Sequence, residues 1–148
     1  NAVRLGFLSL APLLVSGLIC LVDDFQTARI GAIAFAIYAA ALLSFLGGVR
    51  CGFELMRSPD QPDGLRLLFS AIPTLIGWGY AAVVVAFPVL PGAAAAFAGL
   101  YAVQYAWDAK SAADAGAPAW YPLLRQVLTG GVMIVCLLLP FADLLLML

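Results

Sequence analysis

The chain has 148 residues, of which 65% are hydrophobic and 10% are charged, and its formal net charge is −1. Soluble domains average about 45–50% apolar and about 25% charged residues, so this composition excludes an ordinary soluble domain and indicates several membrane spans. The near-neutral charge argues against nucleic acid as a partner, and the absence of histidine removes the commonest metal ligand and general base.

Five apolar segments approach the roughly 20 residues that a helix needs to cross about 30 Å of hydrocarbon. In chain order these predicted spans are 5–22, 30–53, 67–87, 92–107 and 120–142. The first is longer than the apolar core of a signal peptide and is followed by no A-x-A cleavage site, so we interpret it as a retained span. We therefore predict a single all-α membrane domain over residues 1–148, built as a bundle of five transmembrane helices.

Lysine and arginine are concentrated on alternate connections between the predicted spans. The N-terminal end, the second and fourth loops and the adjoining span ends carry Arg4, Arg50, Arg57, Arg66, Lys110 and Arg125. The first loop holds only Arg29, and the third loop and the C-terminal end hold neither residue type. The positive-inside rule then places the N-terminus in the cytoplasm and the C-terminus outside.

Small residues recur at every fourth position of the second span. The row consists of Ala32, Ala36, Ala40, Ser44, Gly48 and Gly52. Such spacing lets a second helix backbone approach closely, although the alanine half of the row is equally explained by the alanine-rich composition of this span. We predict a close helix contact at Ser44, Gly48 and Gly52, with Gly47 beside them, to a helix of this chain or of another chain.

Polar side chains gather at the cytoplasmic side of three predicted spans. They are Arg50, Glu54, Gln104, Asp108, Arg125, Gln126 and Thr129. Arg50 stands four residues before Glu54, a spacing at which the two side chains can pair on one helix face. An Arg50–Asp108 or an Arg125–Asp108 ion pair is also predicted, because charges left unpaired there are costly. The alternatives are that Arg50 only snorkels to the surface, or that the guanidinium groups hold a lipid headgroup or another anionic ligand.

Two aromatic residues lie near the middle of the third span, away from the interfacial belts that aromatic residues usually occupy. Trp78 and Tyr80 alternate with Gly77 and Gly79, and they follow Pro73, which predicts a kink. The two rings either form the wall of a ligand pocket or fill the space that the glycines leave.

Sets of residues that commonly carry catalysis are missing from the sequence. There are no paired carboxylates within a span, no glycine-rich phosphate loop, and no Ser/His/Asp or Cys/His set. Cys20, Cys51 and Cys136 lack the paired spacing of a metal site and are interpreted as small apolar fillers. We predict that the protein is not an enzyme and has no metal or cofactor.

Two separated stretches of the chain resemble the transmembrane protein 69 family. Residues 43–52 read LSFLGGVRCG, which is similar to the family pattern SFLGG-[IV]-[RH]-W-G, with Cys51 where the family has tryptophan. Residues 118–129 read PAWYPLLRQVLT, which is similar to P-x-W-[FY]-x-x-L-R-x-x-x-T, and residues 70–73 look like the small-residue-plus-proline part of its third span. The resemblance covers nearly the whole chain. It implies a polytopic protein of the bacterial inner membrane or of mitochondria, and it implies no substrate.

Two functional hypotheses follow from these patterns. The first is a non-catalytic accessory or scaffold subunit of a larger complex in the bacterial inner membrane, with other membrane proteins and the bilayer as partners. The mitochondrial relatives suggest a bioenergetic membrane, by analogy only. The alternative is a membrane protein or transporter that binds a small molecule or a phospholipid at a polar site on the cytoplasmic side. The residues proposed for that site are Arg50, Glu54, Trp78, Gln104, Asp108 and Arg125.

Overall fold

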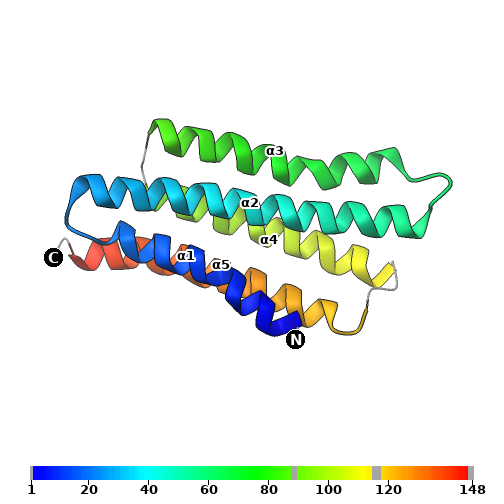
Figure 1. Cartoon of the computed structure of the whole chain (residues 1–148). Coiled ribbons are helices and arrows are strands. Elements are labelled where there is room, and N and C mark those ends of the chain that lie inside the picture. Colours follow the sequence, from blue (N-terminus) through cyan, green and yellow to red (C-terminus); the bar gives the residue numbers. More distant parts are fainter. Residues whose placement is uncertain (1, 88–89, 115–117, 147–148) are drawn as a thin grey trace.

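The computed structural model describes residues 2–87, 90–114 and 118–146, which form five helices and no strand. The helices are α1 (Ala2–Cys20), α2 (Phe25–Arg57), α3 (Gly64–Ala86), α4 (Leu90–Asp114) and α5 (Tyr121–Leu146). They lie side by side with their axes along one common direction (Figure 1). The prediction of an all-α bundle is therefore confirmed for the described part of the chain.

Two aspartates at the starts of helices explain why α2 and α3 begin earlier than the apolar segments predicted. Asp24 caps α2 by accepting a hydrogen bond from the backbone N–H of Thr27 at 2.8 Å. Asp63 caps α3 in the same way and accepts from the N–H of Leu65 at 2.9 Å. At 33 residues, α2 is about 50 Å long and thus longer than the roughly 30 Å of hydrocarbon in a bilayer.

Helices α2 and α4 each pack against three of the other helices. Helix α2 packs against α1, α3 and α4, while α5 packs against α1 and α4. Helices α1, α2, α4 and α5 therefore surround one core, and α3 packs on its outside against α2 and α4 (Figure 1). The largest fully buried side chains of that core are Leu13, Phe35, Leu43, Phe97, Tyr101, Val132 and Cys136.

The alanine half of the row of small residues faces this core. Ala32, Ala36 and Ala40 are all buried. Further along α2 the close contact is at Gly47, where a methyl group would lie 2.6 Å from the carbonyl oxygen of Ser70 on α3. A side chain larger than hydrogen at Gly47 would therefore push α3 away from α2.

The predicted contact at the other half of the row is wrong for the helices of this chain. A methyl group at Gly48 or Gly52 would have no described neighbour within 4 Å, and the Ser44 hydroxyl donates to the carbonyl of Ala40 in its own helix. Four residues turn a helix through about 400°, so a four-residue row drifts about 40° at each step and leaves the buried face. A contact between these residues and another chain stays a prediction.

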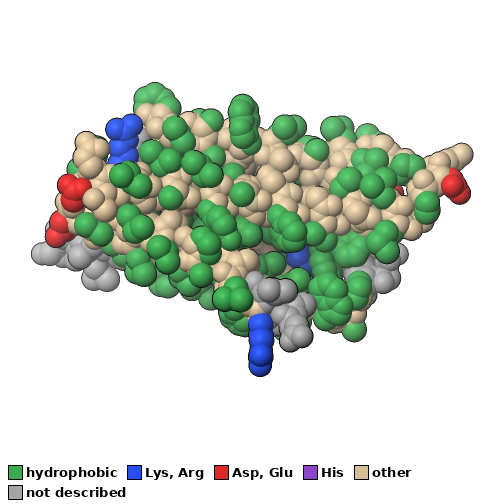
Figure 2. Space-filling view, viewed as in Figure 1, with side chains coloured by type: hydrophobic (Ala, Val, Ile, Leu, Met, Phe, Trp, Pro, Cys, Tyr) green, Lys and Arg blue, Asp and Glu red, His purple; other side chains and the backbone are tan. Residues whose placement is uncertain are grey.

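The outer surface of the bundle is strongly apolar. Figure 2 shows hydrophobic side chains along the full length of one face, with acidic side chains at its two ends. Within the described residues, α2, α3 and the part of α5 from Tyr121 to Leu139 are long and apolar enough to cross a membrane, and Gly6–Cys20 is a shorter apolar helix. The chain is therefore a multi-pass membrane protein by the length and apolarity of its helices.

Candidate polar site in the bundle core

Five polar side chains are buried together where α2, α4 and α5 meet. We call Arg50, Gln104, Asp108, Arg125 and Thr129 the polar cluster, and none of them is more than 8% exposed. Gln104 precedes Asp108 by four residues on α4, and Arg125 precedes Thr129 by four on α5. Residues four apart lie one turn apart on the same helix face, so each helix directs both of its polar side chains inward.

Asp108 is the acidic centre of the polar cluster. Its Oδ2 pairs with Nη2 of Arg125, and its Oδ1 lies 4.0 Å from Nε of Arg50. The structure thus contains both of the ion pairs that the sequence offered as alternatives. One buried carboxylate faces two buried guanidinium groups, and this inner group of charges carries an excess of one positive charge.

Arg50 also contacts an aromatic pair on the outside of the cluster. Its Cζ lies 4.7 Å from the centre of the Trp107 ring, a distance at which a guanidinium group interacts favourably with an indole face. The Trp107 ring in turn packs on Phe69 of α3, with 5.1 Å between ring centres. Trp107 is 44% exposed and Phe69 41%, so Arg50 links the buried cluster to rings on the outer surface.

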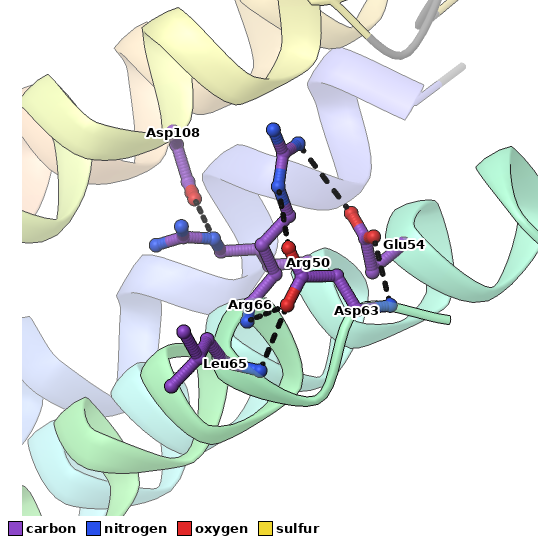
Figure 3. A network of polar contacts seen from close by, with 6 residues as sticks. All are labelled: Arg50, Glu54, Asp63, Leu65, Arg66 and Asp108. Atoms are coloured by element: carbon purple, nitrogen blue, oxygen red, sulfur yellow. Dashed lines mark hydrogen bonds and ion pairs between the residues drawn. The ribbon is translucent and has the colours of Figure 1, made fainter. Parts of the chain in front are cut away.

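Glu54 forms its ion pair with Arg66 of α3 and not with Arg50. Its Oε2 lies 3.7 Å from Nη1 of Arg66, and its Oε1 accepts the backbone N–H of Asp63 at 3.4 Å. Arg66 also approaches Asp63, with 3.6 Å between Nε and Oδ2. Figure 3 shows Arg50 turned toward Asp108 and away from this group. The predicted Arg50–Glu54 pair is therefore wrong, because the first turn of α3 brings a nearer partner to Glu54.

Several buried polar atoms of the polar cluster have no hydrogen-bond partner among the described residues. Among the described residues, neither amide atom of Gln104 nor the hydroxyl of Thr129 has a hydrogen-bond partner. The same holds for Nε and Nη1 of Arg125. Each buried polar group without a partner costs about 1–3 kcal/mol. Sequence reasoning noted Thr129 at the start of the fifth span without giving it a role, although its four-residue spacing from Arg125 already placed the two on one face.

Aromatic rings bound the polar cluster along the bundle axis. Toward the loops, Phe53 and Tyr121 pack edge to face with 4.8 Å between ring centres. Toward the middle of the bundle, the buried Tyr101 donates a 2.7 Å hydrogen bond to the carbonyl of Ala39. Phe53 lies three residues beyond Arg50 and Tyr101 three residues before Gln104, so the rings stand about one turn from the cluster at either end.

Trp78 and Tyr80 do not form a pocket wall. Trp78 is 70% exposed, whereas the preceding Gly77 faces α2, where a methyl group would lie 2.9 Å from Leu43. Successive helix residues point about 100° apart, which turns Trp78 outward when Gly77 faces inward. Tyr80 packs edge to face on the core residue Phe97, with 5.4 Å between ring centres.

The chemistry that the polar cluster offers is that of an oxyanion site. Guanidinium, amide and hydroxyl groups all donate hydrogen bonds, and guanidinium groups suit the planar or branched oxygens of carboxylates and phosphates. In the part of the chain that the structure describes, no three Cys, Asp or Glu side chains form a group that would hold a metal ion. The three cysteines are unpaired thiols.

Comparison with known proteins places this architecture in a family. A family model described as "Protein of unknown function (DUF3429)" matches residues 1–141. The chain belongs to the DUF3429 family. The residues that the DUF3429 model matches include all five members of the polar cluster.

The resemblance to transmembrane protein 69 is also confirmed. This DUF3429 chain is 38% identical to Transmembrane protein 69 of Xenopus tropicalis over 78 residues. The aligned part is 52% of this chain and 30% of that relative, so the chain matches less than a third of the relative's length. No solved structure matches the chain.

Proposed function

We propose that this DUF3429 protein is a five-span membrane protein whose polar cluster binds an anionic ligand group at the cytoplasmic end of the bundle. The observation that carries the proposal is that the buried side chains of Gln104 and Thr129, on the same helix faces as Asp108 and Arg125, have no hydrogen-bond partner among the described residues. A cluster with a purely structural role would be expected to satisfy its polar groups internally.

The charge balance favours an anion as the occupant. Arg50 and Arg125 share the single carboxylate of Asp108. The carboxylates of Glu54 and Asp63 lie 3.7 Å and 3.6 Å from nitrogens of Arg66 and form no ion pair with Arg50 or Arg125 among the described residues. At about 4 Å and an effective dielectric constant of about 20, a further negative charge would gain roughly 4 kcal/mol from each guanidinium before desolvation is counted. A carboxylate or phosphate group would thus balance the inner charges and accept hydrogen bonds from the unused donors of Gln104, Arg125 and Thr129.

The length of the helices and the positions of the charges support the topology. With 19 residues, α1 is about 28 Å long, close to the roughly 30 Å of hydrocarbon in a bilayer, and with 25 residues α4 is about 37 Å long, which exceeds it. In the sequence, six of the seven Lys and Arg residues belong to the N-terminal segment, to the second and fourth loops or to the span ends beside those loops, and the polar cluster lies at the end of the bundle that carries these two loops. By the positive-inside rule this end faces the cytoplasm, and in a bacterium the membrane is the inner membrane.

The double substitution Gln104→Leu with Thr129→Val tests the proposal. It removes the unpartnered amide and hydroxyl groups while keeping similar volume, so the fold should be as stable as before or more stable. Wild-type protein should show a raised Tm with inorganic phosphate, succinate or short-chain phosphatidylglycerol, each compared with chloride at equal ionic strength, because a ligand stabilises the state that binds it.

The double variant should lose this rise in Tm. A Gln126→Leu variant, changed at an exposed position on the same helix, serves as the control and should keep it. The proposal fails if no probe raises the Tm of the wild type, or if the double variant responds as the wild type does.

One observation favours the accessory-subunit hypothesis as a second candidate. Gly48 is exposed on α2, and neither it nor Gly52 has a described neighbour, so another helix has room to approach there. Purification in mild detergent should then recover a partner protein with the wild type and lose it with Gly48→Leu. Recovery of a bare monomer from native membranes would count against this role.

A further inference from the structure

We propose that the anionic group is the phosphate of an anionic phospholipid, which reaches the polar cluster sideways from the cytoplasmic leaflet between α3 and α4. This inference rests on the proposed function and names the source of its ligand. It is carried by the position of Arg50 between Asp108 and the partly exposed pair Phe69 and Trp107.

The terminal nitrogens of Arg50 are available for a ligand. Its described ion pair uses Nε and is long, at 4.0 Å from Asp108. Neither Nη nitrogen has a hydrogen-bond or ion-pair partner in the described residues. Figure 3 shows the guanidinium pointing away from the group formed by Arg66, Glu54 and Asp63. A planar guanidinium with two free terminal nitrogens binds two phosphate oxygens at once.

Aromatic rings stand at both ends of the polar cluster along the bundle axis. The edge-to-face pair of Phe53 and Tyr121 stands on the loop side, and Tyr101, fixed to the carbonyl of Ala39, stands on the side of the membrane centre. Arg50 is therefore the member of the cluster that leads outward, since its guanidinium lies against a ring that is 44% exposed. A ligand arriving past Arg50 comes from the side of the bundle.

The surface on that side suits a lipid better than a water-soluble anion. Phe69 and Trp107 come from two different helices and form one stacked, partly exposed pair. Tryptophan favours the level of the headgroups, where its ring meets apolar chains and its N–H meets polar groups. With the phosphate on Arg50, the glycerol and the first part of an acyl chain would lie on these two rings.

Lipid binding to the purified full-length chain tests the inference. Retention of phosphatidylglycerol and of phosphatidylcholine would be measured by native mass spectrometry, with inorganic phosphate binding measured in parallel by calorimetry. We expect phosphatidylglycerol to be retained about tenfold more strongly than phosphatidylcholine, which corresponds to about 1.4 kcal/mol.

Variants assign this preference to the proposed route. Arg50→Gln should remove the preference for phosphatidylglycerol, and Arg50→Lys should weaken it because the paired donors are lost. Trp107→Leu should reduce the preference severalfold although it changes no charge. Arg57→Gln is the matched control, because Arg57 lies two turns along the same helix and is exposed. Since Trp107 is largely on the surface, its variant keeps the test informative even where an Arg50 variant fails to fold.

The possible results separate the inference from the proposed function. Binding of inorganic phosphate without any preference among lipids would overturn the phospholipid source and leave the anion site in place. Equal loss of lipid in the Arg50→Gln and Arg57→Gln variants would overturn the inference by showing general surface attraction. Absence of both phosphate and lipid binding would overturn the inference and the proposed function together.

Discussion

Asp108 is the counterion of two buried arginines, and its position illustrates how a single charge organises this end of the bundle. It lies on the inward face of α4, with Arg125 of α5 on one carboxylate oxygen and Arg50 of α2 facing the other. Three helices are thereby connected through one side chain. A buried charge without a partner costs several kcal/mol, so the loss of Asp108 would be felt by both arginines.

Replacing Asp108 by Asn should destabilise the protein strongly. The asparagine leaves two buried cations without a counterion, and breaking a buried pair from one side typically costs about 3–5 kcal/mol. The free energy of unfolding would be measured by denaturant titration in mild detergent. Asp60→Asn, at an exposed loop position, should change it by no more than about 0.5 kcal/mol. Equal free energies of unfolding for the two variants would show that Asp108 does not stabilise the fold.

Asp24 gives the start of α2 a dependence on pH. Its carboxylate accepts hydrogen bonds from the N–H and the hydroxyl of Thr27, which lower its pKa below the ordinary value of 3.8. Because the pKa is lower in the folded state, the stabilisation is complete above the ordinary pKa and is lost as pH falls through the lowered pKa.

Hydrogen exchange of amides 25–28 measures this effect. Asp24→Ala should speed exchange at pH 6 relative to the wild type, and the difference, taken after correction for intrinsic rates, should shrink as the pH approaches 2. Asp23→Ala, at the neighbouring exposed position, should leave exchange unchanged at both pH values. A difference that grows toward low pH would contradict the capping account.

At the scale of the helix, α2 shows how packing selects one face from an almost uniformly apolar segment. The helix buries alanines against the core in its first half and approaches α3 through Gly47 in its second half. Gly48 is only one residue further but points about 100° away, toward the outside of the bundle. Neighbouring glycines of α2 thus have opposite environments.

The substitution Gly47→Ala should therefore destabilise the protein, whereas Gly48→Ala should not. The methyl group at Gly47 would lie 2.6 Å from the backbone oxygen of Ser70, so the helices must separate, at a cost of about 1–3 kcal/mol. At Gly48 nothing described lies within 4 Å, and alanine should be neutral or should stabilise the helix by up to about 1 kcal/mol. Melting temperatures in one detergent compare the two variants, and the account fails if Gly48→Ala is the more damaging.

The helices and the ion-pair partners of Asp108 could be predicted from the sequence. The direction in which Glu54 and Trp78 point could not. Long apolar segments have few alternatives to helices in a membrane, and a buried aspartate at one end of the bundle has few cations to choose from. The pairing of Glu54 with Arg66 and the outward turn of Trp78 depend on where α3 docks against α2, which the local spacing does not determine. The drift of the small-residue row has a different cause, the helical repeat itself, which turns each fourth residue about 40° further round.

At the scale of the whole molecule, charge and apolarity divide the bundle along its long axis. The polar cluster, the group around Arg66 and most of the basic residues lie at one end, while apolar side chains cover much of the outer surface (Figure 2). A membrane protein with this distribution should be oriented with its basic end in the cytoplasm. The anion site would then be filled from the cytoplasmic leaflet.

Cysteine labelling tests the proposed orientation. With the three native cysteines replaced, a single cysteine at Asp60 should be protected from a membrane-impermeant maleimide in intact bacterial cells and labelled after permeabilisation. A single cysteine at Gln26, in the first turn of α2 at the opposite end, should be labelled in intact cells. The reverse pattern would contradict the proposed orientation.

A high-resolution structure of the chain in nanodiscs of its native lipids tests the anion site most directly. We expect an oxyanion group at about 2.7–3.2 Å from donors of Arg125, Gln104 or Thr129, with density continuing past Arg50 to Trp107. A cluster in which Gln104 and Thr129 bond only to protein groups or to water, with no other density beside the arginines, would contradict it.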